Sequence, residues 1–373
     1  MARAPLIAIS MGDPGGVGPE VILKALDDGA VRRRARWLLF ASDRAMTQAA
    51  RECRIPAAWT ELPGQFASTT LTSLEAGEVG VVDLCRDVGL DPATDFARRP
   101  DRTNGVVSFE CVRRAIELMQ LPGEHPWRAG AVVTGPISKE AWALAGWARY
   151  PGHTELFAES FRAQKFAMMF HAPPAQTAHG QGPGLNVILA TVHRPLRTVP
   201  GALTTARVLE TIELGHGAMR RLGFPSPRIG VCGLNPHAGE HGLLGDEDDR
   251  VISPAVAAAR NSGWDASGPW PADTIFQGAL AYEGAPAARF DLVVAMYHDQ
   301  GLIPLKTLAW DRAVNFTVGL SHGGHPVWRT SPDHGTAFDI AGAANADAGS
   351  MKAAVLLAVR LAGSDGESAP GGV

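Results

Sequence analysis

The feature that most constrains this chain is a repeated pattern, a short apolar run followed closely by a histidine. Three such runs, residues 185–192, 229–234 and 292–296, are followed by His193, His237 and His298. Apolar runs of this length predict buried strands. In an open α/β sheet, ligands bind beyond the carboxyl ends of the strands. The pattern therefore predicts three imidazoles delivered to one such edge.

Three histidines in this arrangement favour a metal site, although any one of them alone would be better explained as a satisfied core residue. Three neutral imidazoles leave coordination positions open for a substrate, which is typical of a catalytic site. Zn²⁺, Co²⁺, Mn²⁺ or another transition ion would suit imidazole, because ligand type does not select among them. Asp299, Asp273 and Glu240 are candidates to orient the rings through hydrogen bonds.

The alternation of strand-like and helical segments predicts an α/β fold with parallel sheet. Expected strands include residues 5–10, 37–41, 79–84 and 129–134, and expected helices include residues 19–26, 105–120, 204–222 and 349–361. We expect residues 91–104 and 268–274 to be a surface connection and a rigid turn, and Gly301 to break the chain after the strand at 292–296. Residues 1–373 are expected to form one family unit with two lobes, one from the first and last thirds and the other from the middle.

Residues 11–20, MGDPGGVGPE, form a glycine-rich turn between the first strand and the first helix. Such a turn lets backbone N–H groups approach an anion. It matches neither the dinucleotide pattern GxGxxG nor the P-loop, so a plain tight turn is an equal alternative.

Composition excludes several classes of protein. The net charge is −4 and no basic stripe is present, which argues against nucleic-acid binding. The four cysteines have no CxxC spacing, so reduced thiols are expected. The first residues lack the features of a signal peptide, and no apolar run approaches the roughly 20 residues that span a bilayer. We therefore expect a cytoplasmic protein without a membrane partner.

Polar residues around these runs could bind an anionic substrate. Lys306, Asn315 and Arg329 follow the third run and would supply two cations and an amide, although each alone is more often a surface residue. His153 and Thr154 stand at an expected helix start, where backbone N–H groups attract a phosphate or carboxylate. The alternative role for Thr154 is to cap that helix.

Motifs along nearly the whole chain resemble one enzyme family. They are MGDPGGVGPE (11–20), TGPISKE (134–140), PGHTE (151–155), HRPLR (193–197), LNPHAGE (234–240), GPWPADT (268–274), MYHDQG (296–301) and RTSPDHGTAFDIAG (329–342). In this order they resemble the 4-hydroxythreonine-4-phosphate dehydrogenases of vitamin B6 synthesis and their paralogues that oxidise phosphorylated four-carbon hydroxy acids. Residues 173–184 and 320–328 look longer than the family's usual segments.

The resemblance implies a fold like that of isopropylmalate and isocitrate dehydrogenases, with two α/β lobes and a cleft between them. It implies roles for individual residues. The metal ligands would be His193, His237 and His298; the substrate-binding residues would be His153, Thr154, Lys306, Asn315 and Arg329; and a loop for the adenosine part of NAD would include His334, Gly335, Thr336, Ala337 and Asp339. The cofactors would be NAD or NADP and a divalent metal such as Zn, Co or Mg, and the assembly a homodimer.

The implied reaction is the oxidation, with decarboxylation, of a phosphorylated 3-hydroxy acid. The first substrate expected is 4-phosphohydroxy-L-threonine, which would give 3-amino-2-oxopropyl phosphate; the alternative is 4-phosphothreonate, 4-phosphoerythronate or another cis-diol acid. A metal-bound hydroxide, Asp299 and Lys306 are all open as general base. A three-histidine lyase and a two-lobed binding protein are the rival functions. Formation of NADH would exclude the lyase. His237→Ala should leave ligand affinity largely intact in a binding protein, whereas an enzyme should lose metal and turnover.

Overall fold

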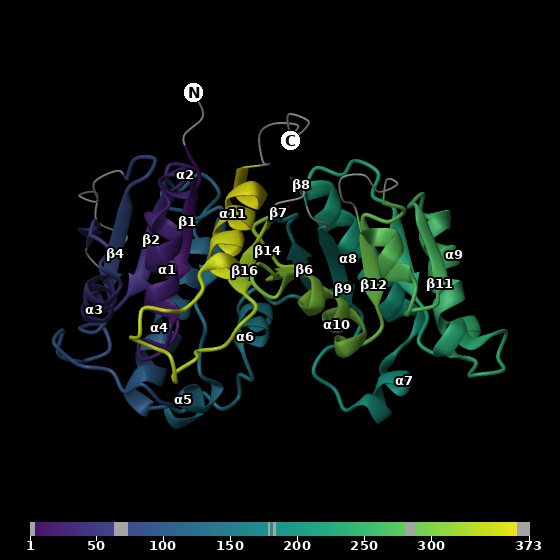
Figure 1. The fold of residues 1–373 in the computed structure, drawn as a ribbon, viewed down its shortest axis with the longest axis horizontal. Helices are drawn as coiled ribbons and strands as arrows, with labels where there is room; N and C mark the ends of the chain where they lie inside the picture. The colour runs from purple at the N-terminus through teal and green to yellow at the C-terminus, as the bar shows by residue number, and fades with distance from the viewer. Residues whose placement is uncertain (1–3, 63–73, 178–179, 182–183, 281–287, 364–373) are drawn as a thin grey trace. The chain divides into compact units, whose positions relative to one another are not determined.

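The computed structural model describes residues 4–62, 74–177, 180–181, 184–280 and 288–363 (Figure 1). The chain divides into two compact units. Unit 1 comprises the chain up to Gln164 together with the segment that resumes at Leu320, and unit 2 comprises Lys165–Gly319.

Unit 1 is a parallel sheet with helices on its faces. Its strands, in sheet order, are β16 (Arg329–Pro332), β5 (Ala131–Thr134), β1 (Leu6–Ser10), β2 (Arg36–Ala41), β4 (Val79–Asp83) and β3 (Thr60–Glu61). Neighbouring strands in this order pair in parallel. A hairpin, β14 (Ser321–His322) and β15 (His325–Pro326), precedes β16. The helices are α1 (Gly18–Asp27), α2 (Gly29–Arg32), α3 (Asp43–Cys53), α4 (Arg102–Met119), α5 (Lys139–Leu144), α6 (His153–Ser160) and α11 (Gly349–Gly363).

The central strands of unit 1 are buried along their whole length, because helices cover the sheet. Strands β1, β2 and β5 consist of buried residues throughout, as expected for parallel strands with both faces covered. Helix α11, the last element of the chain, packs against α1 and against β1, β5 and β16; in Figure 1 it is the yellow helix beside the purple strands. The two ends of the chain therefore share one core.

Unit 2 has a mixed sheet. Its strands, in sheet order, are β11 (Ala266–Trp270), β10 (Ile229–Cys232), β12 (Leu292–Ala295), β9 (Leu185–Leu189), β6 (Ala167–Ala172) and β13 (Val314–Val318). The first four are mutually parallel, whereas β6 is antiparallel to both β9 and β13. A small hairpin joins β7 (Gln176–Thr177) to β8 (Gly180–Gln181). The helices are η1 (Leu196–Thr198), α7 (Val199–Ala202), α8 (Thr205–Arg221), η2 (Pro236–Gly239), η3 (Asp248–Ile252), α9 (Ser253–Asn261), η4 (Ile275–Ala279) and α10 (His298–Ala309).

The α/β class predicted from the sequence is confirmed, and most predicted strands and helices lie within a few residues of their observed bounds. Three local predictions were wrong. Gly301 does not break the chain but lies inside α10; residues 266–270 form strand β11 where a turn was expected; and α4 begins at Arg102, within the expected surface connection. In each case tertiary packing overrode the local signal of glycine, proline or polar residues.

Gly301 is inside a helix because the helix lies very close to the sheet beneath it. A Cβ on Gly301 would lie 2.7 Å from a methyl carbon of Leu189 and 2.8 Å from one of Val187, both on β9. The absence of a side chain therefore lets α10 approach its sheet, which positions His298 at the helix start.

Two predicted features are only partly visible. Of the long segment expected at 173–184, residues 178–179 and 182–183 lie outside the described part of the chain, as does the tail 364–373. Among the described residues, no helix has both the length and the apolar character to cross a bilayer.

Candidate active site

The strands that precede His193, His237 and His298 all end at the same edge of the sheet in unit 2. Strand β12 lies between β10 and β9, and all three are parallel. His298 follows β12 by three positions, His193 follows β9 by four, and His237 follows β10 by five. The carboxyl ends of neighbouring parallel strands meet at one edge, so the topology carries all three histidines toward the same side.

Two of these rings are close neighbours. The ring centroids of His193 and His298 are 5.5 Å apart. His193 and His237 are exposed and His298 is half-buried. The alternative that each is a satisfied core histidine is therefore excluded. Among the described residues, however, no three histidine, cysteine or carboxylate side chains are gathered closely enough to hold an ion. The three-histidine metal site therefore stays a prediction.

Two of the histidines are oriented by carboxylates in a way that suits metal binding. Nδ1 of His298 lies 2.8 Å from Oδ1 of Asp299, and Nδ1 of His237 lies 3.2 Å from Oε2 of Glu240. A neutral ring that donates through Nδ1 presents the lone pair of Nε2 outward, the tautomer that carboxylate partners impose on metal-binding histidines. The donor set thus fits a transition ion, and two of the three carboxylates predicted to orient the rings make these contacts.

The loop that carries His237 has an unusual backbone. His237, Ala238, Glu240 and His241 all have positive φ, between 45° and 58°. A non-glycine residue in this left-handed backbone conformation costs of order 1 kcal/mol or more, and such residues cluster at functional sites. Buried Asp248 holds the loop, because its carboxylate accepts the backbone N–H groups of Leu234 and Asn235 at 2.8 and 3.1 Å.

Sequence reasoning missed both Asp248 and Gln300 as supports of the site. Gln300 is buried, accepts the N–H of Met296 at 2.7 Å and donates to the carbonyl of Gly233 at 2.8 Å. It therefore ties the end of β12 to the end of β10, just before His298 and His237. The motif MYHDQG contains Gln300, but nothing in the local pattern distinguishes a buried amide from an exposed one.

Lys306 and Asn315 both belong to unit 2. Lys306 lies on α10, eight residues after His298 or roughly 12 Å along the axis, and its Nζ stands 5.4 Å from the ring centroid of Trp310. Asn315 is on β13, and its side-chain Oδ1 is buried without a hydrogen-bond partner in the part of the chain that the structure describes. A buried orphan acceptor is costly, so Asn315 is suited to receive a donor from a ligand.

In unit 1, Arg329 is a buried cation. It is 3% exposed, and among the described residues no carboxylate lies within ion-pair distance of it. Nε and Nη2 donate to Oγ1 of Thr134 at 2.9 and 2.7 Å. Burial lowers the pKa of Arg329 to about 9, partly offset by the charge of Glu155.

His153 is close enough to Arg329 to be influenced by its charge; the residue is half-buried, and its Nε2 is buried. Burial, the charge of Arg329 and the charge of Lys139 together hold the pKa of His153 well below its usual value, so the ring is neutral. Its Nε2 has no hydrogen-bond partner. Thr154 does not cap helix α6, whose N-cap is Gly152 without a side-chain bond, and so the capping alternative is excluded.

The predicted cofactor loop of unit 1 contacts the glycine-rich turn. The N–H of Val17 donates to the carbonyl of Thr336 at 2.9 Å. A Cβ on Gly16 would lie 2.8 Å from that same carbonyl oxygen, so glycine is needed for the close approach. Nε2 of His334 is buried without a partner, while its Nδ1 lies 3.0 Å from the carbonyl of Gly335. Asp339 is exposed.

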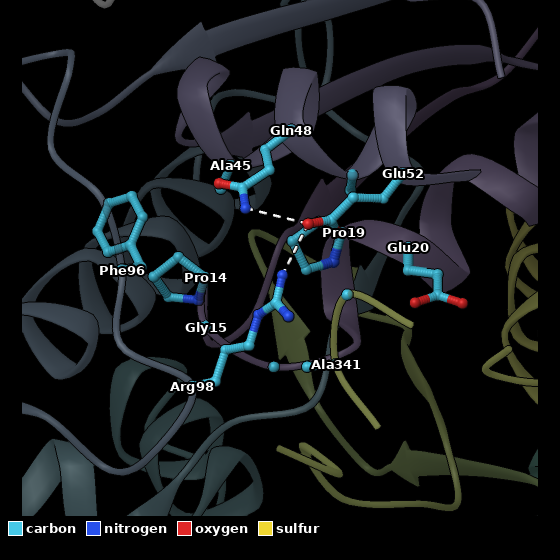
Figure 2. A pocket seen from close by; sticks show the side chains of 13 residues that line it. Pro14, Gly15, Pro19, Glu20, Ala45, Gln48, Glu52, Phe96, Arg98 and Ala341 are labelled. Carbon is cyan, nitrogen blue, oxygen red and sulfur yellow. Dashed lines mark hydrogen bonds and ion pairs between the residues drawn. The ribbon is translucent and has the colours of Figure 1, made fainter. Parts of the chain in front are cut away.

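A polar pocket adjoins this contact (Figure 2). It is lined by Pro14–Gly16 of the turn, by one face of α3, by Phe96 and Arg98, and by Ala341 and Gly342 at the end of the cofactor loop. Figure 2 shows Gln48 and Arg98 both reaching the carboxylate of Glu52, at 3.1 and 2.7 Å. A side chain at position 342 would collide with the guanidinium of Arg98. The turn and the end of the loop thus line one pocket, to which they contribute Gly15, Gly16 and Gly342.

Asp13 lies at the base of the same turn. Its Oδ1 accepts the N–H of Gly15 at 3.0 Å and Nδ2 of Asn104 at 2.9 Å, and its Oδ2 is buried without a partner. Burial raises the pKa of Asp13 to about 7, with the two hydrogen bonds opposing the shift. The carboxyl group is therefore poised to titrate near neutrality.

One unit with a parallel sheet and one with a mixed sheet, a glycine turn in contact with a second glycine-containing loop, and histidines at strand ends are features of a dehydrogenase of the α/β class. A sequence model of the pyridoxal phosphate biosynthetic protein PdxA family matches residues 33–358. The chain belongs to this family and is an oxidoreductase, as the resemblance predicted.

Individual relatives agree with this assignment. The chain is 42% identical to a 4-hydroxythreonine-4-phosphate dehydrogenase of Trichlorobacter lovleyi, over 96% of this chain and 98% of the relative. It is 38% identical to a D-threonate 4-phosphate dehydrogenase of Salmonella typhimurium, over 95% and 98%. Among solved structures, a 4-hydroxythreonine-4-phosphate dehydrogenase from Klebsiella pneumoniae matches with a TM-score of 0.76 and 37% identity, over 97% of this chain and 99% of that one.

Proposed function

We propose that the protein oxidises 4-phosphohydroxy-L-threonine, with NAD or NADP as the hydride acceptor, to 3-amino-2-oxopropyl phosphate and CO₂. The substrate's hydroxyl group loses its proton, its carbon gives a hydride to the nicotinamide, and the resulting β-keto acid loses CO₂. A proton then returns to the carbon that carried the carboxylate, so no net proton is consumed. The observation that carries the proposal is buried Arg329, which has no carboxylate partner among the described residues, near neutral His153 in a chain of this family.

Unit 1 would bind an anionic group of the substrate. A buried guanidinium without a carboxylate partner is costly, and an anionic ligand would offset the cost. The neutral imidazole of His153 can donate or accept through Nε2 without adding charge, and Thr154 at the start of α6 places a hydroxyl and backbone N–H groups nearby. These three residues suit a phosphate or carboxylate.

Unit 2 would act on the alcohol. His193, His237 and His298 would hold a divalent ion such as Zn²⁺, Co²⁺ or Mg²⁺, with Asp299 and Glu240 fixing two of the rings. When bound, such an ion lowers the pKa of a hydroxyl and stabilises negative charge on oxygen. Because Oδ1 of Asp299 is engaged by His298, we assign proton transfer to Nζ of Lys306. Asn315 would accept a hydrogen bond from the substrate through its side-chain Oδ1.

The contact between the glycine turn and the cofactor loop supports NAD binding in unit 1. His334, Gly335, Thr336, Ala337 and Asp339 would hold the adenosine half of the dinucleotide. The close backbone approach at Gly16 and Thr336 and the unpaired Nε2 of His334 fit a ligand that brings its own donors and acceptors. An exposed carboxylate such as Asp339 is suited to the ribose hydroxyls of NAD.

The test is turnover by metal-stripped and metal-restored protein. NADH formation is measured by absorbance with 4-phosphohydroxy-L-threonine, with and without Zn²⁺, Co²⁺ or Mg²⁺. The proposal expects turnover that disappears on stripping and returns on restoration, and that is lost in His298→Ala. Turnover without nicotinamide would instead indicate a lyase, and ligand binding without turnover a binding protein.

A second candidate substrate is 4-phosphothreonate or 4-phosphoerythronate. It is favoured by the 38% identity to a relative named D-threonate 4-phosphate dehydrogenase. Comparing kcat/KM for the amino acid and the hydroxy acids decides between the two, because the substrates differ at the carbon next to the carboxylate.

We also propose that the protein is a cytoplasmic homodimer. Ile303 on α10 is 65% exposed and borders a largely apolar pocket of about 580 Å³, and Trp310, directly after the helix, is 77% exposed. Exposed apolar side chains of this size would favour association. The four cysteines are free thiols, which suits a reducing compartment. Light scattering on the protein and on Ile303→Glu tests the dimer; a monomeric wild type would overturn it.

A further inference from the structure

Arg329 is held in an unusual way for a buried cation. Two of its N–H groups donate to a single neutral oxygen, Oγ1 of Thr134, at 2.9 and 2.7 Å. Both residues are buried, Arg329 at 3% and Thr134 at 0% exposure. A carboxylate in place of this hydroxyl would form the bidentate pair that arginine usually makes, but it would also neutralise the charge.

The sheet explains why Thr134 is the residue that meets Arg329. Strands β16 and β5 are parallel neighbours, and Arg329 is in register with Val132. Successive side chains alternate between the two faces of a strand. Thr134 comes two positions after Val132 and therefore lies on the same face of the sheet as Arg329. The long side chain of Arg329, running along the strand direction, reaches Thr134 from there.

A neutral tether orients a guanidinium without using its charge. The planar fork has several donors in fixed directions, so fixing two of them on one acceptor fixes the plane and leaves the remaining donors to a ligand. Nearby side chains leave most of the charge uncompensated, since His153 is neutral, Lys139 is a cation, and the charge of Glu155 only partly offsets the effect of burial on the pKa of Arg329. The surroundings of Arg329 therefore favour an anion.

We propose that Thr134 is a positioning residue that aims Arg329 at an anionic group of the substrate, a phosphate or a carboxylate, while leaving its charge available. The inference rests on the proposed function, because it assumes that Arg329 contacts the substrate. The competing explanation is that Thr134 only satisfies two buried donors and matters for stability alone.

The variants Thr134→Val and Thr134→Ser separate these explanations. Valine keeps the shape and removes the acceptor, whereas serine keeps the hydroxyl. We expect Thr134→Val to raise KM by about 10- to 100-fold, as for loss of a hydrogen bond to a charged group, with kcat changed by less than about 3-fold. Thr134→Ser should restore KM to near the wild-type value.

Thr330→Val is the matched control. Thr330 is also fully buried, follows Arg329 on β16, and donates to the carbonyl of Ala354 at 3.0 Å. It lies on the opposite face of the strand from Arg329. Its loss should lower the melting temperature about as much as Thr134→Val does but leave KM unchanged. Equal KM for the wild type and Thr134→Val would overturn the proposal.

Binding of inorganic phosphate separates this inference from the proposed function. Calorimetry on the wild type, Thr134→Val, Thr134→Ser and Arg329→Met should show binding that is lost with Arg329→Met, weakened about 10-fold or more by valine and kept by serine. That result without NADH formation would support the positioning role and reject the proposed reaction. Phosphate binding equal in the wild type and Thr134→Val, or absent from the wild type, would overturn the positioning role; if Thr134→Val fails to fold, Thr134→Ala takes its place.

Discussion

The side-chain amide of Gln300 donates to the carbonyl of Gly233, 67 positions earlier in the chain, at 2.8 Å. Since Gln300 also accepts the N–H of Met296, one side chain links the strand ends that precede His237 and His298. The spacing of two proposed metal ligands thus depends on a residue that binds no ligand itself.

Gln300→Leu should leave both backbone groups unsatisfied and loosen the two histidine segments. We expect the free energy of unfolding to fall by about 2–4 kcal/mol and the affinity for Co²⁺ to fall about 10-fold. Chemical denaturation and a metal titration followed by absorbance measure the two effects. Gln277→Leu, at an exposed position of the same unit, is the control; comparable losses in it would show that Gln300 has no special role.

Asp299→Asn should weaken metal binding without unfolding the protein. The amide no longer carries the charge that makes Asp299 a good partner for Nδ1 of His298, and loss of such a partner typically costs 10- to 100-fold in metal affinity. The exposed side chain of Asp299 makes a change in stability above about 0.5 kcal/mol unexpected. Asp311→Asn, further along the same unit, should change neither quantity. Unaltered metal affinity in Asp299→Asn would contradict the proposed orientation of the ring.

Two glycines inside helices should respond to alanine with opposite signs. Gly301→Ala places a methyl group 2.7–2.8 Å from side chains of β9, and such overpacking costs about 1–3 kcal/mol. Gly217, in α8, has no neighbouring atom within 4 Å of an added Cβ, so Gly217→Ala should raise the free energy of unfolding by up to about 1 kcal/mol. Urea denaturation of both variants checks this. Stabilisation by Gly301→Ala would show that α10 does not need close contact with β9.

Asp13 should make stability depend on pH. Its pKa is raised by burial from 3.8 to about 7, so the folded state favours the protonated form. The stability that this form contributes is complete below about pH 4 and is lost as the pH rises to 7, by at most about 1.4 kcal/mol per pH unit. Asp13→Asn removes the titrating group. The free energy of unfolding of this variant, relative to that of the wild type, should rise between about pH 4 and pH 7 and then stay constant.

Unfolding curves of the wild type and Asp13→Asn from pH 4 to 9 give the difference directly. Asp265→Asn, at an exposed position, should follow the wild type throughout. A constant difference between the wild type and Asp13→Asn across the whole range would mean that folding does not raise the pKa of Asp13.

The sequence by itself determined the α/β class, the approximate bounds of most strands and helices, and the family. These properties depend on local periodicity and on motifs made of residues that are adjacent in the sequence. The histidines after strands 185–189, 229–232 and 292–295 could be recognised for the same reason, because an apolar run and the residues that end it are adjacent in sequence.

The tertiary structure alone decided which distant groups meet. Thr134 and Arg329 are 195 positions apart, and their contact depends on the register of two parallel strands. Gly301 is helical because β9 lies beneath it, and Asp13 titrates near pH 7 because packing removes water from its carboxyl group. Burial and long-range contacts depend on residues that are distant in the sequence, so no local sequence pattern could have predicted them.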